Sequence, residues 1–143
     1  NLIITRSFSK AYGLAGLRVG YSVCSALIAD FINRVREPFN VNYTAQVAAI
    51  AALSDDDHLK DSIEVNTKGY EQLTNGFDSL KLKYIPSHAN FIAVQFNNAM
   101  NTYNDLLKEG VIVRPVEMSG YLRISIGTAD ENEHLLSALR KVL

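Results

Sequence analysis

The sequence predicts a mixed α/β chain whose second half is a compact α+β domain. Short apolar runs rich in β-branched residues alternate with segments in which apolar residues recur at helical spacing. From residue 90 onward these runs follow the order β-α-β-β-α, which favours helices packed on one face of a sheet. With 143 residues and 48% hydrophobic content, the chain is large enough to form a folded core.

The first half is predicted to hold two strands and two helices. Ser25 is the expected N-cap of the first helix, and Pro38 ends that helix because proline cannot continue it. Thr44 is the candidate cap of the second helix, whose alanines suit close packing. The strands are expected at 2–5 and 17–24, and the helices at 25–37 and 44–55.

A long helix is predicted at 55–80, and its acidic start suits the positive end of a helix dipole. A domain boundary is expected near its beginning, which divides the chain into 1–60 and 61–143. The last helix has Thr128 and Glu131 at the spacing of a capping box. Strands are expected at 81–86, 90–96, 111–116 and 121–127, and helices at 99–110 and 128–143.

Composition excludes several classes of protein. The net charge is -1 and no basic run occurs, so nothing indicates a nucleic-acid partner. No apolar run is long enough to cross a membrane, and the start of the sequence has no secretory signal. Cys24 is the single cysteine, so we expect no disulfide framework and a reducing, cytoplasmic location. The three histidines lie far apart in sequence, so no metal site is expected.

Chemistry-bearing side chains gather in the segment SFSKAYGLAGLRVGY at 7–21. Lys10 lies among apolar residues, and burial or a neighbouring cation would make its amine a better nucleophile. Arg18 suits phosphate oxygens, and Ser7 and Ser9 add hydroxyl donors. Together these residues are able to hold a phosphate while an amine reaches a nearby carbonyl. The alternative from the residues alone is a surface lysine and a structural arginine.

This segment resembles the lysine segment of fold-type I aminotransferases, which use pyridoxal phosphate. The order Ser, any residue, Ser, Lys, small, aromatic, Gly and then Arg eight residues after the lysine matches that motif. Further along, four segments resemble, in order, the later landmarks of histidinol-phosphate aminotransferases. They are REPFNVN at 36–42, PSHANFIAV at 86–94, GVIVRPV at 110–116 and LRISIGTADEN at 122–132.

The resemblance implies roles for six residues. Lys10 would form a Schiff base with pyridoxal 5'-phosphate and later move a proton between substrate and cofactor. Ser7, Ser9 and Arg18 would bind the cofactor phosphate. Arg123 would grip the anionic end of the substrate, and Arg114 would be a second anion contact. Without the resemblance, both of these arginines would be read as solvated residues at strand ends.

The resemblance also implies a reaction, a location and an assembly. The substrates would be L-histidinol phosphate with the glutamate/2-oxoglutarate pair, in histidine biosynthesis in the cytoplasm, and the enzyme would be a homodimer. Two other readings stay open. One is another aminotransferase or a threonine-phosphate decarboxylase with the same cofactor, and the other is a non-catalytic structural or association module.

The family's chains are well over twice this length, and the sequence begins without methionine only a few residues before the lysine. We therefore expect a C-terminal fragment. Residues 1–60 would be the end of the large cofactor-binding domain, and 61–143 the small domain. An aspartate that pairs with the pyridine nitrogen and an aromatic residue that stacks on the ring would precede this sequence. The fragment alone is therefore expected to be inactive and to expose apolar surface.

Overall fold

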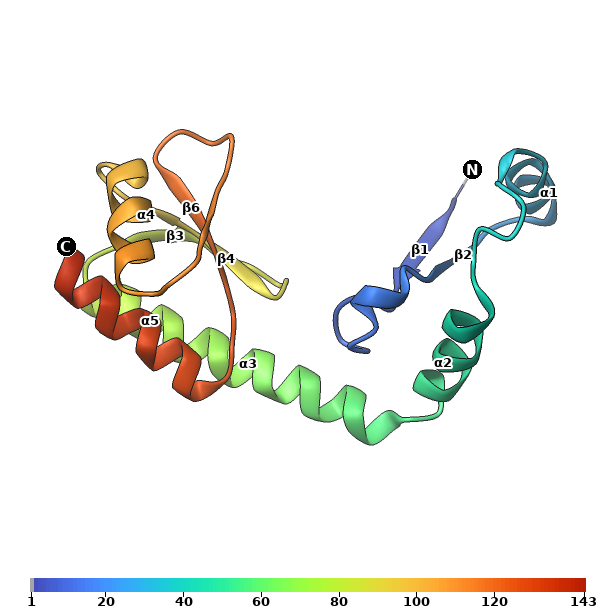
Figure 1. Cartoon of the computed structure of the whole chain (residues 1–143), viewed down its shortest axis with the longest axis horizontal. Coiled ribbons are helices and arrows are strands. Elements are labelled where there is room, and N and C mark those ends of the chain that lie inside the picture. Colours follow the sequence, from blue (N-terminus) through green and yellow to red (C-terminus); the bar gives the residue numbers. More distant parts are fainter. Residues whose placement is uncertain (1) are drawn as a thin grey trace. The chain divides into compact units, whose positions relative to one another are not determined.

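The computed structural model describes residues 2–143, which form two compact units (Figure 1). The first unit ends at Ile63, and the second unit is Glu64–Leu143. The longest helix, α3 (Asp56–Ser79), begins in the first unit and continues into the second. Among the described residues, no helix is both long and apolar enough to span a membrane.

The first unit contains a two-stranded antiparallel sheet and two helices besides the start of α3. Ser7, the last residue of the first strand, pairs with Gly20, the first residue of the second. The loop between them includes a short 3-10 helix, so the second strand begins three residues later than predicted. The elements are β1 (Ile4–Ser7), η1 (Ala15–Leu17), β2 (Gly20–Val23), α1 (Ala26–Val35) and α2 (Tyr43–Leu53).

Both helices of this unit begin at a side-chain cap. The Ser25 Oγ accepts a hydrogen bond from the Ile28 N–H, which confirms the predicted cap of α1. For α2 the prediction of Thr44 was wrong, because the Asn42 Oδ1 accepts from the Ala45 N–H at 2.8 Å. Asparagine caps at least as well as threonine, and Asn42 lies directly before the first helical residue.

The first unit buries little apolar surface. Its core consists of Phe8, Val19, Ala45 and Ala49. The predicted apolar face of α1 forms, but no residue of that helix is buried, and Phe31 and Val35 are 53% and 80% exposed. An exposed apolar stripe of this kind is typical of a surface that packs against further protein.

The second unit is an antiparallel four-stranded sheet in the order β3-β4-β6-β5, with helices packed on it. The last strand in this order is shorter than the predicted 111–116, because the Val111 N–H closes the preceding helix by bonding to the Leu106 carbonyl. The elements are β3 (Lys83–Ile85), β4 (Phe91–Gln95), α4 (Ala99–Lys108), β5 (Arg114–Pro115), β6 (Tyr121–Ser125) and α5 (Ala129–Val142).

Strict alternation along β4 and β6 gives the sheet a buried face and an outer face. Ile92, Val94 and Leu122 are fully buried and Ile124 is 1% exposed, whereas the residues between them are half-buried. The buried face packs on apolar residues of the helices, including Phe77 of α3. The outer face carries the Arg123 side chain of β6.

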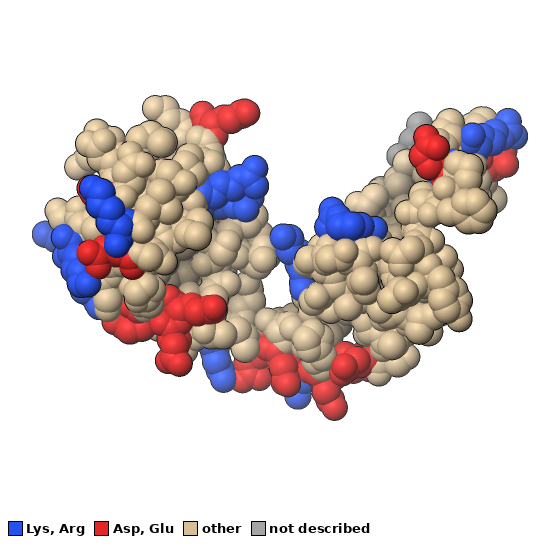
Figure 2. All heavy atoms as spheres, viewed as in Figure 1, with Lys and Arg blue, Asp and Glu red and all other residues tan. Residues whose placement is uncertain are grey.

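Helix starts in the second half follow the predicted chemistry. The Thr128 Oγ accepts from the Glu131 N–H while the Glu131 carboxylate accepts from the Thr128 N–H, which confirms the capping box. The hydrogen bond from the Thr128 backbone lowers the pKa of Glu131. Acidic side chains also gather over the start of α3 (Figure 2), where the Asp55 carboxylate accepts from the His58 N–H.

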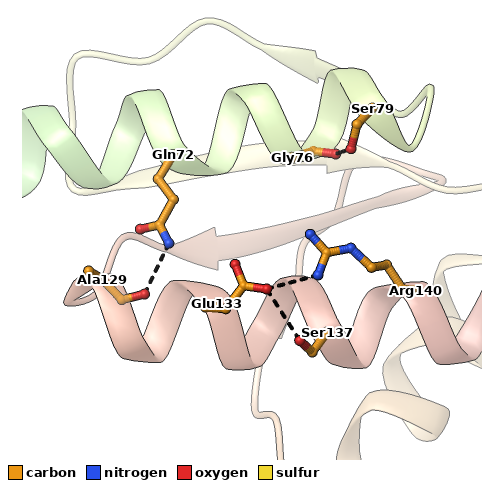
Figure 3. Close-up of polar contacts among 7 residues, drawn as sticks. All are labelled: Gln72, Gly76, Ser79, Ala129, Glu133, Ser137 and Arg140. Atoms are coloured by element: carbon orange, nitrogen blue, oxygen red, sulfur yellow. Dashed lines mark hydrogen bonds and ion pairs between the residues drawn. The ribbon is translucent and has the colours of Figure 1, made fainter.

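A buried amide ties the start of α5 to α3. The Asn132 side chain accepts from the Gly127 N–H at 2.9 Å and donates to the Gln72 side chain at 3.1 Å. Gln72 in turn donates to the Ala129 carbonyl at 3.0 Å (Figure 3). These bonds satisfy a polar group that is only 2% exposed, so the end of β6 is held at a fixed place against α3.

Gly69 allows this close approach of α3. A Cβ at position 69 would lie 2.6 Å from the Ile126 Cγ2 and 3.0 Å from the Gly127 carbonyl oxygen. We expect Gly69→Ala to destabilise the chain by about 1–2 kcal/mol, since overpacking outweighs the gain in helix propensity. Urea unfolding followed by circular dichroism tests this, with Asn75→Ala at an exposed position of α3 as control. A Gly69→Ala chain more stable than the original would contradict the packing argument.

Candidate active site

The loop between β1 and β2 holds Lys10 in a closed hairpin. Phe8 closes the base of the loop twice: its N–H donates to the Val19 carbonyl at 3.2 Å, and its carbonyl accepts from the Leu14 N–H at 2.9 Å. At the tip, the Lys10 carbonyl accepts from the Gly13 N–H at 2.8 Å. Gly13 has φ +70°, a conformation that glycine adopts without steric cost.

The two side chains on either side of Ser9 have opposite environments. Phe8 is 3% exposed and packs against Tyr12, with ring centroids 4.8 Å apart. Lys10 is exposed. The buried phenylalanine therefore anchors the loop, while the amine two residues later stays accessible to a ligand. The partial burial of Lys10 that the sequence suggested is not seen in this structure.

Three of the predicted phosphate-binding residues lie together beside this loop. The Ser9 N–H donates to the Ser7 Oγ at 3.1 Å, and the Arg18 Nη1 reaches the Ser9 Oγ at 3.5 Å. The Arg18 Nη1 also donates to the Ala15 carbonyl at 2.9 Å, which fixes the guanidinium against the 3-10 helix. Two hydroxyls and a guanidinium, linked through Ser9, form a donor set that suits phosphate oxygens.

Arg18 adopts a backbone conformation that is unusual for its type. Its φ and ψ are 53° and 46°, in the left-handed region, where it caps η1. A non-glycine residue held there carries strain of about 1–3 kcal/mol, and such residues concentrate at functional sites. With this backbone conformation, the Arg18 Nη1 lies 3.5 Å from the Ser9 Oγ.

The two other predicted site residues lie on the outer face of the second unit's sheet. Arg123 on β6 and Arg114 on β5 are directly opposite partners in the antiparallel ladder, so their side chains share one face. Like charges in this arrangement repel each other. Among the described residues, no ion pair involves either arginine. The pair therefore forms a local positive charge that suits an anionic group.

Phe91 is a neighbour of this pair that the sequence analysis missed as a site residue. The Arg123 Cζ lies 4.9 Å from the centroid of the Phe91 ring. The Arg123 Nε is buried and has no hydrogen-bond partner within the described part of the chain. Phe91 lies in the predicted strand at 90–96 and in the landmark segment PSHANFIAV, but no role was assigned to it. The pairing register that brings it to Arg123 is not visible in the sequence.

The first unit also has a largely apolar cavity of about 820 Å³, lined in part by Tyr21, Arg36 and Phe39. None of the six predicted site residues lines it. Within residues 2–143, no cluster of three or more metal-ligating side chains occurs. The six predicted site residues therefore fall into two separate groups, four on the Lys10 loop of the first unit and the arginine pair in the second unit.

A lysine on a loop beside hydroxyl and guanidinium donors is an arrangement that suits group-transfer enzymes with a bound phosphorylated cofactor. The model of the class I and II aminotransferase family matches residues 1–139, and the chain belongs to this family.

The chain is similar to curated histidinol-phosphate aminotransferases along its whole length. It is 53% identical over 146 residues to that of Methylobacillus flagellatus and 54% identical over 147 residues to histidinol-phosphate aminotransferase 2 of Pseudomonas aeruginosa. In both comparisons 100% of this chain is covered, but only 40% of the relative. The chain thus spans about 40% of the length of the curated relatives it matches.

A solved relative shares the fold. The crystal structure of histidinol-phosphate aminotransferase from Sinorhizobium meliloti, in complex with pyridoxal-5'-phosphate, matches with a TM-score of 0.90 and 32% identity. The match covers 99% of this chain and 41% of that one. The predicted fold class, an α/β chain with an α+β second half that forms part of a fold-type I transferase, is confirmed.

Proposed function

We propose that this chain is the C-terminal part of a pyridoxal-phosphate-dependent aminotransferase that transfers an amino group between L-histidinol phosphate and 2-oxoglutarate, in histidine biosynthesis. The observation that carries the proposal is identity of 53% to a histidinol-phosphate aminotransferase across the whole chain. Because the chain spans only about 40% of such relatives, we expect it to be inactive by itself.

The residues at the Lys10 loop fit the cofactor. Ser7, Ser9 and Arg18 supply the hydroxyl and guanidinium donors that a phosphate group needs, and the Arg18 Nη1 lies within 3.5 Å of the Ser9 Oγ. Lys10 is exposed next to this set, where its amine is accessible to an aldehyde. When bound, pyridoxal phosphate supplies an electron sink that stabilises negative charge at the substrate carbon.

Each residue of the loop then has a physical task. Arg18 and the two serines hold the phosphate end, which fixes the distance between that end and the lysine. The Lys10 Nζ would hold the cofactor through its aldehyde, and its free amine would be the group that moves a proton at the substrate carbon. Phe8 is buried and anchors the backbone of the loop that carries this amine.

The arginine pair gives the substrate its orientation. Arg123, with Arg114 directly across the ladder, would bind the anionic end of the substrate, far from the reacting amine. A phosphate monoester carries more charge than a carboxylate and accepts several hydrogen bonds, so two adjacent guanidinium groups suit it. This supports a phosphorylated amino alcohol as substrate.

The division into domains, the assembly and the location belong to the same proposal. Residues 1–60 would be the end of the large domain and residues 61–143 the small domain. The exposed apolar face of α1 supports packing of the first unit against further protein, either the rest of the large domain or a second subunit of a homodimer. A biosynthetic enzyme with these substrates is expected in the cytoplasm.

The test is a comparison of substrates in the intact enzyme that contains this chain. We expect L-histidinol phosphate to be the preferred amino donor to 2-oxoglutarate, by about 100-fold in kcat/KM over aromatic amino acids, because the latter lack the doubly charged end group. A coupled assay of glutamate formation measures this. Release of carbon dioxide from threonine phosphate, or preference for an unphosphorylated amino acid, would refute the assignment.

A further inference from the structure

We propose that Phe91 is a positioning residue that holds the Arg123 guanidinium for the anionic end of the substrate. The inference rests on the proposed function only in giving Arg123 that ligand. Phe91 acts through Arg123, because the Arg123 guanidinium lies over the aromatic ring of Phe91. This role is assigned from cross-strand geometry, from the lack of a hydrogen-bond partner for the Arg123 Nε among the described residues, and from the position of Arg114.

The register of the sheet brings the two side chains together. Arg123 of β6 lies directly opposite Ala93 of β4, and Phe91 lies two residues along β4 from that point. Alanine has only a methyl group, so the long Arg123 side chain has room to cross β4 diagonally. Diagonal neighbours on one face are within reach of aromatic and long side chains. The Cζ accordingly lies 4.9 Å from the ring centroid.

Arg123 is oriented without being neutralised. Its Nε is buried and has no hydrogen-bond partner among the described residues, and no carboxylate of residues 2–143 forms an ion pair with it. The Arg123 guanidinium instead lies over the Phe91 ring, with its Cζ 4.9 Å from the ring centroid. A carboxylate partner would compete with an anionic ligand, whereas an aromatic ring attracts the cation and leaves its full charge to the ligand.

The Phe91 ring also lies on the side of Arg123 that is opposite to a second positive charge. Strand β6 lies between β4 and β5, so Phe91 lies on one side of Arg123 and Arg114 on the other. Stacking on Phe91 draws the Arg123 guanidinium toward β4 and away from Arg114. The two guanidinium groups are then able to approach one anion from opposite sides. Two arginine side chains without a fixed orientation would instead repel each other.

The test uses equilibrium binding, so that turnover does not enter the measurement. In the intact enzyme with Lys10→Ala, which stops the reaction, the Kd of L-histidinol phosphate is measured by calorimetry with and without Phe91→Leu. We expect Phe91→Leu to weaken binding by about 2- to 30-fold, the range of a cation–π contact. Phe91→Tyr keeps an aromatic face and is expected to bind within about twofold of the parent. L-histidinol, which lacks the phosphate, is expected to bind equally to all three.

The control repeats the Phe91→Leu and Phe91→Tyr measurements in an enzyme that also carries Arg123→Ala. If Phe91 acts through Arg123, Phe91→Leu has no further effect on phosphate-dependent binding in that background. A role in packing alone would weaken L-histidinol and L-histidinol phosphate alike, would persist with Arg123→Ala, and would overturn the inference. So would equal binding by the leucine and tyrosine variants. The outcome for the proposed function is read separately, from turnover of L-histidinol phosphate by the enzyme with Lys10 intact.

Discussion

Replacing Lys10 by alanine in the intact enzyme is expected to lower kcat for amino transfer by about four orders of magnitude or more. The loop at 8–19 contains a single lysine, so no neighbouring amine is available to replace it. The proposed roles of Lys10, binding the cofactor aldehyde and carrying the proton, are both lost together. Glutamate formation measures the rate, and borohydride treatment followed by peptide mass analysis detects the covalent link to the cofactor.

The matched control is Lys60→Ala, which removes another exposed lysine of the first unit. We expect its activity and its borohydride labelling to equal those of the parent. The assignment of Lys10 fails if the Lys10→Ala enzyme keeps its activity, or if cofactor is trapped on a different lysine while Lys10 stays unlabelled.

Phe77→Ala is expected to lower the free energy of unfolding of the second unit by about 3–5 kcal/mol. The Phe77 side chain is 0% exposed and belongs to the cluster between α3 and the sheet, with its ring centroid 5.9 Å from that of Tyr84. Removing the ring leaves a cavity that rigid neighbours cannot fill. Hydrogen exchange of the β4 and β6 amides in this chain measures the effect, because those amides lie in the same unit.

Phe39→Ala deletes the same ring at a position that is 96% exposed. Phe39 has φ 57°, and alanine is strained there to a similar degree, so backbone cost does not separate parent from variant. We expect a change below about 0.5 kcal/mol in this chain. Equal losses for Phe39→Ala and Phe77→Ala would show that the described core does not determine stability.

Helices were predicted from the sequence more accurately than strand ends. The long helix and its acidic start, the helix after Ser25 and the capping box at Thr128 depend on neighbours three or four residues away, which the sequence displays directly. The run at 111–116 has strand composition, yet only Arg114–Pro115 pair. Its first residue instead satisfies a carbonyl at the end of α4, a competition that the sequence pattern does not reveal.

The site residues that are close in sequence were likewise easier to predict than those brought together by strand pairing. Ser7, Ser9, Lys10 and Arg18 belong to one hairpin loop, so local spacing was enough to place them near each other. The contact of Phe91 with Arg123 depends on the register of two strands that are far apart in sequence. Register is set by the whole buried face of the sheet, and so the aromatic neighbour was found only in three dimensions.

Strand β6 turns Leu122 and Ile124 inward and Arg123 outward. Core packing and the proposed ligand contact thereby fall on alternate positions of one short segment. Substitutions at the outward positions are expected to change the proposed ligand contact without changing the packing of the interior. Redesign of the preferred end group should accordingly begin with the outward residues of β6 and their neighbours on β4, without compensating changes beneath them.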